Sequence, residues 1–106
     1  MTKVVHCRKQ QFDVYIGRPS LWGNPFHISP TCSRLQAVAR YHAWILTQPA
    51  LLAQVHTLRG KVLGCWCAPQ LCHGSVLAQL AEMPAWEISI LIAKAAHPNI
   101  KGFARP

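Results

Sequence analysis

The sequence predicts a small α/β domain with a Rossmann-like sheet of about three strands, mainly parallel, and flanking helices. Its 106 residues are 51% apolar, which suits one domain with its own core. Short apolar runs typical of strands alternate with segments that have helical spacing. A helical connection joins the second and third predicted strands, and such crossovers produce parallel strands. We therefore expect a single domain over residues 1–106, with the element order β-β-α-α-β-α-α.

Three short runs are expected to form the strands. Residues 3–7 are a β-branched run, and residues 13–16 place Val14 and Ile16 on the same face. Residues 61–67 form the most apolar of the three runs and predict a well-buried third strand.

The first two helices follow the second strand. Ser33 and Gln36 have the spacing of a capping box, and apolar residues then repeat at helical intervals, so we expect a helix over residues 33–46. Pro49 suits the first turn of a second helix, which the Arg-Gly pair at residues 59–60 ends.

The C-terminal part, residues 84–106, is expected to be a helix followed by a tail. Helical spacing returns after His73 and continues to Ala81. Residues 86–96 fit a helix, although their alternating isoleucines also fit a strand. We interpret them as a helix because the run is long and ends in alanines, and its apolar side chains are a candidate homodimer surface. Residues 97–106 are expected to be extended.

The charge balance favours partners that carry phosphate. Eleven Lys and Arg residues stand against three acids, which gives a formal charge of +8. Such a charge suits nucleotides, nucleic acid or anionic surfaces, although scattered basic residues also serve solubility alone. The three acids are Asp13, Glu82 and Glu87, too few and too dispersed for a glycosidase-like carboxylate pair or a two-metal site. Any catalyst must use Cys, His, Ser, Tyr, Arg or backbone amides.

The cysteines predict a cytoplasmic protein with reduced thiols. The chain has five, an odd number, and three of them lie close together in residues 65–72. We find no signal segment and no apolar run of membrane-spanning length, so we expect no membrane partner. In the cytoplasm, clustered cysteines indicate metal binding or reactivity more often than disulfides.

Two loops rich in special residues are expected to face each other. One covers residues 17–26 and the other residues 67–75, and each follows the carboxyl end of a predicted strand. Because parallel strands end at the same edge of a sheet, both loops should line one crevice there.

The second loop offers a candidate zinc site. Cys65, Cys67, Cys72 and His73 supply the ligand count of a Cys3His site, and Cys65 and Cys67 should point to the same side of a strand. The C-x-C spacing differs from the usual C-x-x-C, and adjacent ligands at Cys72 and His73 are awkward. The alternative is that these are small buried thiols beside a turn.

The same loop also begins a helix, which suggests an anion site. The first amides of a helix lack intrahelical partners and bind phosphate readily. Gly74 would let a ligand approach the backbone, and Ser75 would add a hydroxyl. Cys72 would have a lowered pKa as a nucleophile, and His73 could supply a proton. The alternative is that these residues only cap the helix.

The first loop supplies complementary ligand contacts. Gly17 and Ser20 frame it, Arg18 suits a phosphate, Trp22 offers a stacking surface for a base, and Asn24 suits a polar edge. The alternative is a structural loop, in which Trp22 fills the core and Asn24 bonds its own backbone.

Both constellations together resemble a known family. The pattern V-Y-I-G-R-x-S-x-W-G-N-P-F at residues 14–26 and the pattern R-G-K-x-L-G-C-x-C-x-P-x-x-C-H-G at residues 59–74 resemble a small family of domains of unknown function from bacteria and their viruses. The resemblance spans residues 4–82 and implies that the two loops form one site. Members often have an acid where this chain has Ser75, which puts any carboxylate role there in doubt.

These observations give one leading hypothesis and two alternatives. The leading one is binding, or processing, of a nucleotide-like or phosphorylated small molecule in the crevice between the loops, with Cys72 or His73 as the catalytic group if there is turnover. One alternative is a zinc-stabilised module that contacts nucleic acid. The other is a non-catalytic protein that sequesters a nucleotide signal.

Overall fold

Three parallel strands form the sheet. In the computed structural model, which describes residues 1–97, the strands are β1 (Lys3–His6), β2 (Val14–Tyr15) and β3 (Val62–Cys65). Their order is β1-β3-β2, and both outer strands run parallel to β3. The expected small α/β architecture with a three-stranded parallel sheet is therefore confirmed. The third strand is shorter than we expected, because the chain leaves the sheet after Cys65.

Asp13 joins β2 to the beginning of β3. Its amide donates to the carbonyl of Val62 at 2.7 Å, and its carboxylate accepts from the amide of Val62 at 2.8 Å. Gly64 lies in the middle of β3, where a Cβ atom would come within 2.6 Å of the Phe12 ring. The glycine thus lets the segment between β1 and β2 close over the central strand.

Within residues 1–97, four helices and a 3-10 turn accompany the sheet: α1 (Arg34–Ile45), α2 (Pro49–Leu52), a 3-10 turn (Val55–Leu58), α3 (Gly74–Ala81) and α4 (Ala85–Ala96). The capping box at the start of α1 is confirmed, since Gln36 N donates to Ser33 Oγ at 3.1 Å and Ser33 N donates to Gln36 Oε1 at 2.8 Å. The predicted second helix is split into α2 and the 3-10 turn. The ambiguous run near the C-terminus is a helix, α4.

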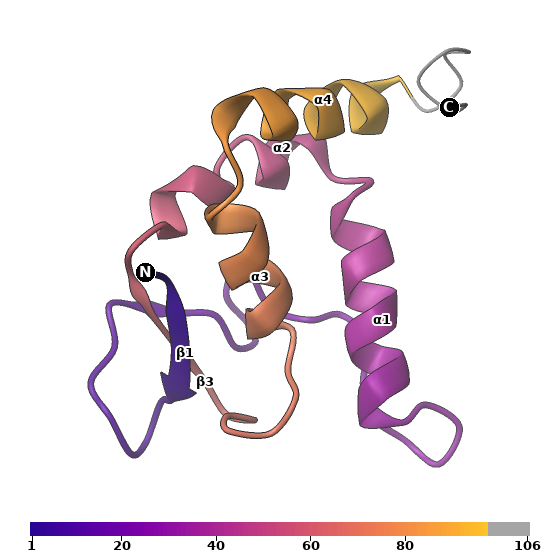
Figure 1. Cartoon of the computed structure of the whole chain (residues 1–106). Coiled ribbons are helices and arrows are strands. Elements are labelled where there is room, and N and C mark those ends of the chain that lie inside the picture. The colour runs from indigo at the N-terminus through magenta and orange to yellow at the C-terminus, as the bar shows by residue number, and fades with distance from the viewer. Residues whose placement is uncertain (98–106) are drawn as a thin grey trace.

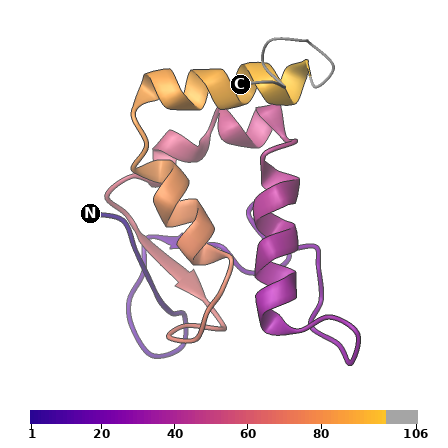
Figure 2. The same ribbon diagram turned by 45° about the vertical axis from the view of Figure 1, so that its right-hand side comes forward.

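The helices pack against the sheet and against one another. Figure 1 shows α3 lying over the sheet, with α1 running beside it. Figure 2 shows α4 lying across α2, at the end of the molecule away from the carboxyl ends of the strands. That leaves the carboxyl edge open to the loops. The largest fully buried side chains are Ile16, Tyr41, Ile45, Leu52, Leu58, Leu63 and Leu77.

α4 differs from the other helices in its burial. None of its residues is fully buried, and Trp86 is 66% exposed. The homodimer surface that we expected here remains a prediction. Among residues 1–97 no single helix is long and apolar enough to cross a membrane, and α3 and α4 reach that length only together, across a bend of 120°. The predicted tail beyond residue 97 lies outside the described residues.

Candidate functional site

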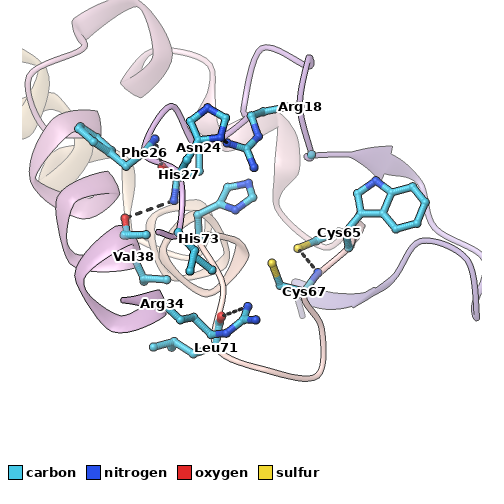
Figure 3. Close-up of a pocket in the computed structure, with 14 residues that line it drawn as sticks. Arg18, Asn24, Phe26, His27, Arg34, Val38, Cys65, Cys67, Leu71 and His73 are labelled. Atoms are coloured by element: carbon cyan, nitrogen blue, oxygen red, sulfur yellow. Dashed lines mark hydrogen bonds between the residues drawn. The ribbon is translucent and has the colours of Figure 1, made fainter. Parts of the chain in front are cut away.

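A cavity of about 300 Å³ lies at the carboxyl edge of the sheet. Three segments line it: the loop after β2, the first turns of α1, and the segment from the end of β3 to the start of α3 (Figure 3). The two loops that we expected to share an edge therefore face the same space, and α1 adds a third wall. The lining residues are Gly17, Arg18, Asn24, Phe26, His27, Ile28, Arg34, Ala37, Val38, Cys65, Trp66, Cys67, Leu71 and His73.

The cavity is basic. Arg18 and Arg34 line it from different walls, and within residues 1–97 the lining includes no carboxylate. Arg18 Nη1 lies 2.6 Å from His27 Nδ1, and Arg34 Nη1 donates to the carbonyl of Leu71 at 3.4 Å. A guanidinium carries several N–H donors in a planar fork, so each arginine retains donors beyond the one that it uses here. The site is thus suited to an anion.

The wall of the cavity near α1 also has apolar side chains. Phe26, Val38 and Leu71 lie close to α1 in the close-up, with Arg34 beside the last two, while Arg18 lies on the other side of the space (Figure 3). Charged and apolar side chains in one cavity favour a ligand that has both an anionic group and a flat or apolar part.

Cys65, Cys72 and His73 form a buried cluster beside the cavity. One candidate ligand atom from each residue lies within 4.8 Å of the others, and the two sulfur atoms are 3.1 Å apart. Cys65 and His73 also line the cavity. Cys67 lies outside this cluster, because the strand ends at Cys65 and the expected alternation of side chains stops there.

The two thiols are hydrogen-bonded to each other. This bond, with a further one from the Cys67 amide to Cys65 Sγ, lowers the pKa of Cys65 to about 5. The same hydrogen bond, together with burial, raises the pKa of Cys72. We expected a lowered pKa at Cys72, and that was wrong: its hydrogen bond with Cys65 and its burial raise the pKa of Cys72, and the lowered pKa belongs to Cys65.

His73 is fixed as a neutral imidazole. Its Nε2 lies 2.7 Å from the carbonyl oxygen of Ile16, which can only accept, so Nε2 carries the proton and Nδ1 has the lone pair. Burial lowers the pKa of His73. The ring also packs edge-on against Tyr41, with 4.9 Å between the ring centroids.

The start of α3 does not offer the free amides that we expected. The Gly74 amide donates to Cys72 Sγ at 3.2 Å, and the Ser75 amide donates to the Cys72 carbonyl at 3.1 Å. A Cβ atom on Gly74 would come within 2.9 Å of Ile16 and Val4, so this glycine allows α3 to pack on the sheet. The Ser75 hydroxyl bonds the Cys72 carbonyl at 2.8 Å. Neither residue lines the cavity.

Trp22 is a core residue. It is only 6% exposed, and its carbonyl accepts a hydrogen bond from the Tyr41 hydroxyl at 2.9 Å. The stacking surface that we expected from Trp22 is therefore unavailable, and the structural alternative is correct for this side chain. Ser20 also lies outside the cavity lining, and its buried hydroxyl has no hydrogen-bond partner within the described part of the chain.

Asn24 lines the cavity and also fixes the loop to α1. Its side-chain amide donates to the Ala37 carbonyl at 3.2 Å, and its oxygen accepts from the Phe26 amide at 2.8 Å. Both polar ends of Asn24 are thus used within the protein. Gly17 lines the cavity beside Arg18 and lies against the Tyr15 side chain.

Several lining residues were not predicted from the sequence. Phe26, His27, Arg34, Trp66 and Leu71 are the main ones. The position of Arg34 could have been predicted. It is the first residue of a helix that follows a loop at the carboxyl edge, which places it near that edge. The contacts of His27 and Leu71 depend on how two separate loops fold, which local spacing does not encode.

The fold and this edge define a small α/β domain with a basic cavity and a Cys-Cys-His cluster. Residues 2–83 match the family described as domain of unknown function DUF4326, and the chain belongs to that family. It is 32% identical over 86 residues to an uncharacterized 12.4 kDa protein in the nrdA-td intergenic region of Enterobacteria phage T4, which covers 77% of this chain and 79% of the relative. No solved structure matches. The family match includes both loops and α3 but leaves α4 outside.

Proposed function

We propose that this protein binds a small phosphorylated, nucleotide-like molecule in the cavity between the two loops. The observation that carries the proposal is the pairing of Arg18 and Arg34 across a cavity whose lining, within residues 1–97, holds no carboxylate. An anion entering this space meets two guanidinium groups and, among the described residues, no carboxylate. The volume of about 300 Å³ is at the lower end of the range for small-molecule sites.

The two sides of the cavity suggest how such a ligand lies. The phosphate would contact Arg18, with Arg34 on the facing wall, and the base or another flat group would lie against Phe26 and Val38. This position, outside the carboxyl ends of parallel strands, is the one that Rossmann-like folds use for ligands. The likeness to Rossmann folds that we propose is limited to this position of the ligand site.

Binding, and not turnover, is the function that the residues support. His73 is neutral and buried, and its Nε2 is engaged by the Ile16 carbonyl. The pKa of Cys72 is raised by its hydrogen bond with Cys65 and by burial, and Cys72 does not line the cavity. All five cysteines lie in the described residues and are free thiols, which suits the cytoplasmic location that we propose.

Calorimetry with the full chain tests the proposal. The panel is nucleoside mono-, di- and triphosphates, inorganic phosphate and a short single-stranded oligonucleotide. We expect a nucleotide to bind, and Arg18→Gln to weaken that binding about 10-fold or more, as loss of a charged hydrogen bond does. Arg40→Gln is the matched control, since Arg40 is exposed on α1 and does not line the cavity.

Two results would contradict this function. One is the lack of nucleotide binding at millimolar ligand. The other is binding of the oligonucleotide alone, equally reduced by Arg18→Gln and Arg40→Gln, which would indicate a diffuse basic surface for nucleic acid.

A further inference from the structure

The buried cluster of Cys65, Cys72 and His73 has a geometry close to that of a metal site. Tetrahedral zinc, with Zn–S near 2.3 Å and Zn–N near 2.0 Å, requires sulfur atoms about 3.8 Å apart and a nitrogen about 3.5 Å from each. Here the sulfur atoms are 3.1 Å apart, and all three ligand atoms lie within 4.8 Å of one another. Zinc therefore requires the sulfurs to separate by about 0.7 Å and the His73 nitrogen to lie about 3.5 Å from each of them, which side-chain rotations can supply.

The backbone around the cluster suits two thiolates. The Cys67 amide donates to Cys65 Sγ at 3.2 Å, and the Gly74 amide donates to Cys72 Sγ at 3.2 Å. Each sulfur thus receives one N–H donor, although two thiolates at this separation repel each other. A divalent cation bound between the sulfurs removes that repulsion.

One ring nitrogen of His73 is held by a carbonyl, as it is in metal-binding histidines. Its Nε2–H donates to the Ile16 carbonyl at 2.7 Å, so its lone pair is on Nδ1. A histidine ligand usually has its second nitrogen held by a carbonyl or a carboxylate in this way. The Tyr41 ring packs against the imidazole and limits its rotation.

We propose that Cys65, Cys72 and His73 bind one zinc ion through three protein ligands and leave its fourth position open to the cavity. Sulfur and imidazole donors select zinc over magnesium or calcium. Cys65 and His73 line the cavity, so a ligand at the fourth position would reach the ion from that side. This proposal can be tested separately from the proposed nucleotide binding, because metal binding is measured without a nucleotide.

The first measurement uses the unchanged full chain. Elemental analysis after purification without chelator should give about one zinc per chain. Replacement by Co²⁺ should give the visible spectrum of a tetrahedral ion with a sulfur-to-cobalt charge-transfer band. The proposal is overturned if the purified chain retains no zinc and also gives no such spectrum on titration with Co²⁺. A Cys65–Cys72 disulfide in protein purified under reducing conditions would overturn it as well.

Variants then test the ligand set. Cys65→Ser, Cys72→Ser and His73→Gln should each lose the metal, whereas Cys32→Ser should keep it, because Cys32 is a buried thiol elsewhere in the chain. Cys67→Ser should also keep one zinc. If it loses zinc as fully as Cys65→Ser, the site has four protein ligands and the open position is wrong. Because a ligand variant can fail to fold, circular dichroism accompanies each measurement. If a variant is unfolded, the cobalt titration of the unchanged chain decides whether the metal site exists.

The open position has its own readout. Azide or inorganic phosphate added to the cobalt protein should change the visible spectrum, since either anion can enter the fourth position. An unchanged spectrum with both anions would overturn the open site. Zinc binding without any nucleotide binding would refute the function proposed above and leave this inference standing.

Discussion

His73 Nε2 donates a hydrogen bond of 2.7 Å to the carbonyl oxygen of Ile16, 57 positions earlier in the sequence. This bond joins the residue before the first loop to the residue before α3. It satisfies a polar group at a fully buried position and sets the tautomer of the imidazole. The two sides of the cavity are therefore held together by one side chain.

Removing this bond should destabilise the fold itself. His73→Ala, compared with the unchanged chain in the presence of a chelator, should lower the free energy of unfolding by about 1–3 kcal/mol, because the Ile16 carbonyl loses its buried partner. Urea denaturation measures the change. His42→Ala is the control, since His42 is exposed on α1 and should shift stability by less than about 0.5 kcal/mol. Equal stability of both variants would show that the bond is unimportant.

Gly74 should resist substitution although it is in a helix. A Cβ atom there would come within 2.9 Å of Ile16 Cδ1 and of both Val4 methyl groups. Gly74→Ala should therefore lower the free energy of unfolding by about 1–3 kcal/mol, despite the better helix propensity of alanine. Gln79→Ala, at an exposed position of the same helix, should change it little. A stabilised Gly74→Ala variant would mean that α3 can move away from the sheet without cost.

The close packing of Gly74 is a feature that local sequence patterns do not encode. The sequence predicted the capping box at Ser33, the parallel crossover, and the approach of two loops at one edge, because each depends on local spacing or on chain topology. It did not predict that Trp22 is buried, because that depends on packing in the core beside Tyr41. Close approaches between distant segments, such as Gly74 against Val4, leave no local pattern.

The thiols illustrate the same limit in the candidate site. Sequence spacing placed Cys65, Cys72 and His73 together, and the structure agrees. The order of their pKa values depends on the hydrogen bond between the two sulfur atoms, which are 3.1 Å apart. The position of Cys72 at the start of a helix predicts a lowered pKa for that thiol alone, but its neighbour Cys65 reverses the order.

Glu82 gives the fold a pH dependence. Hydrogen bonds from the Thr2 hydroxyl at 2.6 Å and amide at 3.0 Å hold the pKa of Glu82 below its usual value. A carboxyl with a lowered folded pKa adds stability above its unfolded pKa of about 4.3, and this stability is lost as the pH falls through the folded pKa. Glu82→Gln should thus lower the thermal unfolding midpoint at pH 7, and the difference from the unchanged chain should shrink in acid.

Thr2→Val separates this effect from simple packing. The Thr2 hydroxyl also accepts from the Gly60 amide at 2.8 Å, a bond that does not titrate. Thr2→Val should therefore lower the unfolding midpoint at acid pH as well as at pH 7, unlike Glu82→Gln. A Glu82→Gln deficit that is the same at pH 7 and in acid would contradict the assigned role.

Phe26, and not Trp22, should contact the flat part of the ligand. Phe26 lines the cavity, whereas the Trp22 ring is in the core. Phe26→Ala should weaken nucleotide binding about 5- to 10-fold, a loss typical of an apolar contact, and should leave binding of inorganic phosphate unchanged. Trp22→Phe should leave both affinities unchanged while it lowers thermal stability, because it removes volume from the core. Calorimetry with a nucleotide and with phosphate measures both variants. If Trp22→Phe lost nucleotide affinity and Phe26→Ala did not, Phe26 would not be the contact and the base would lie away from α1.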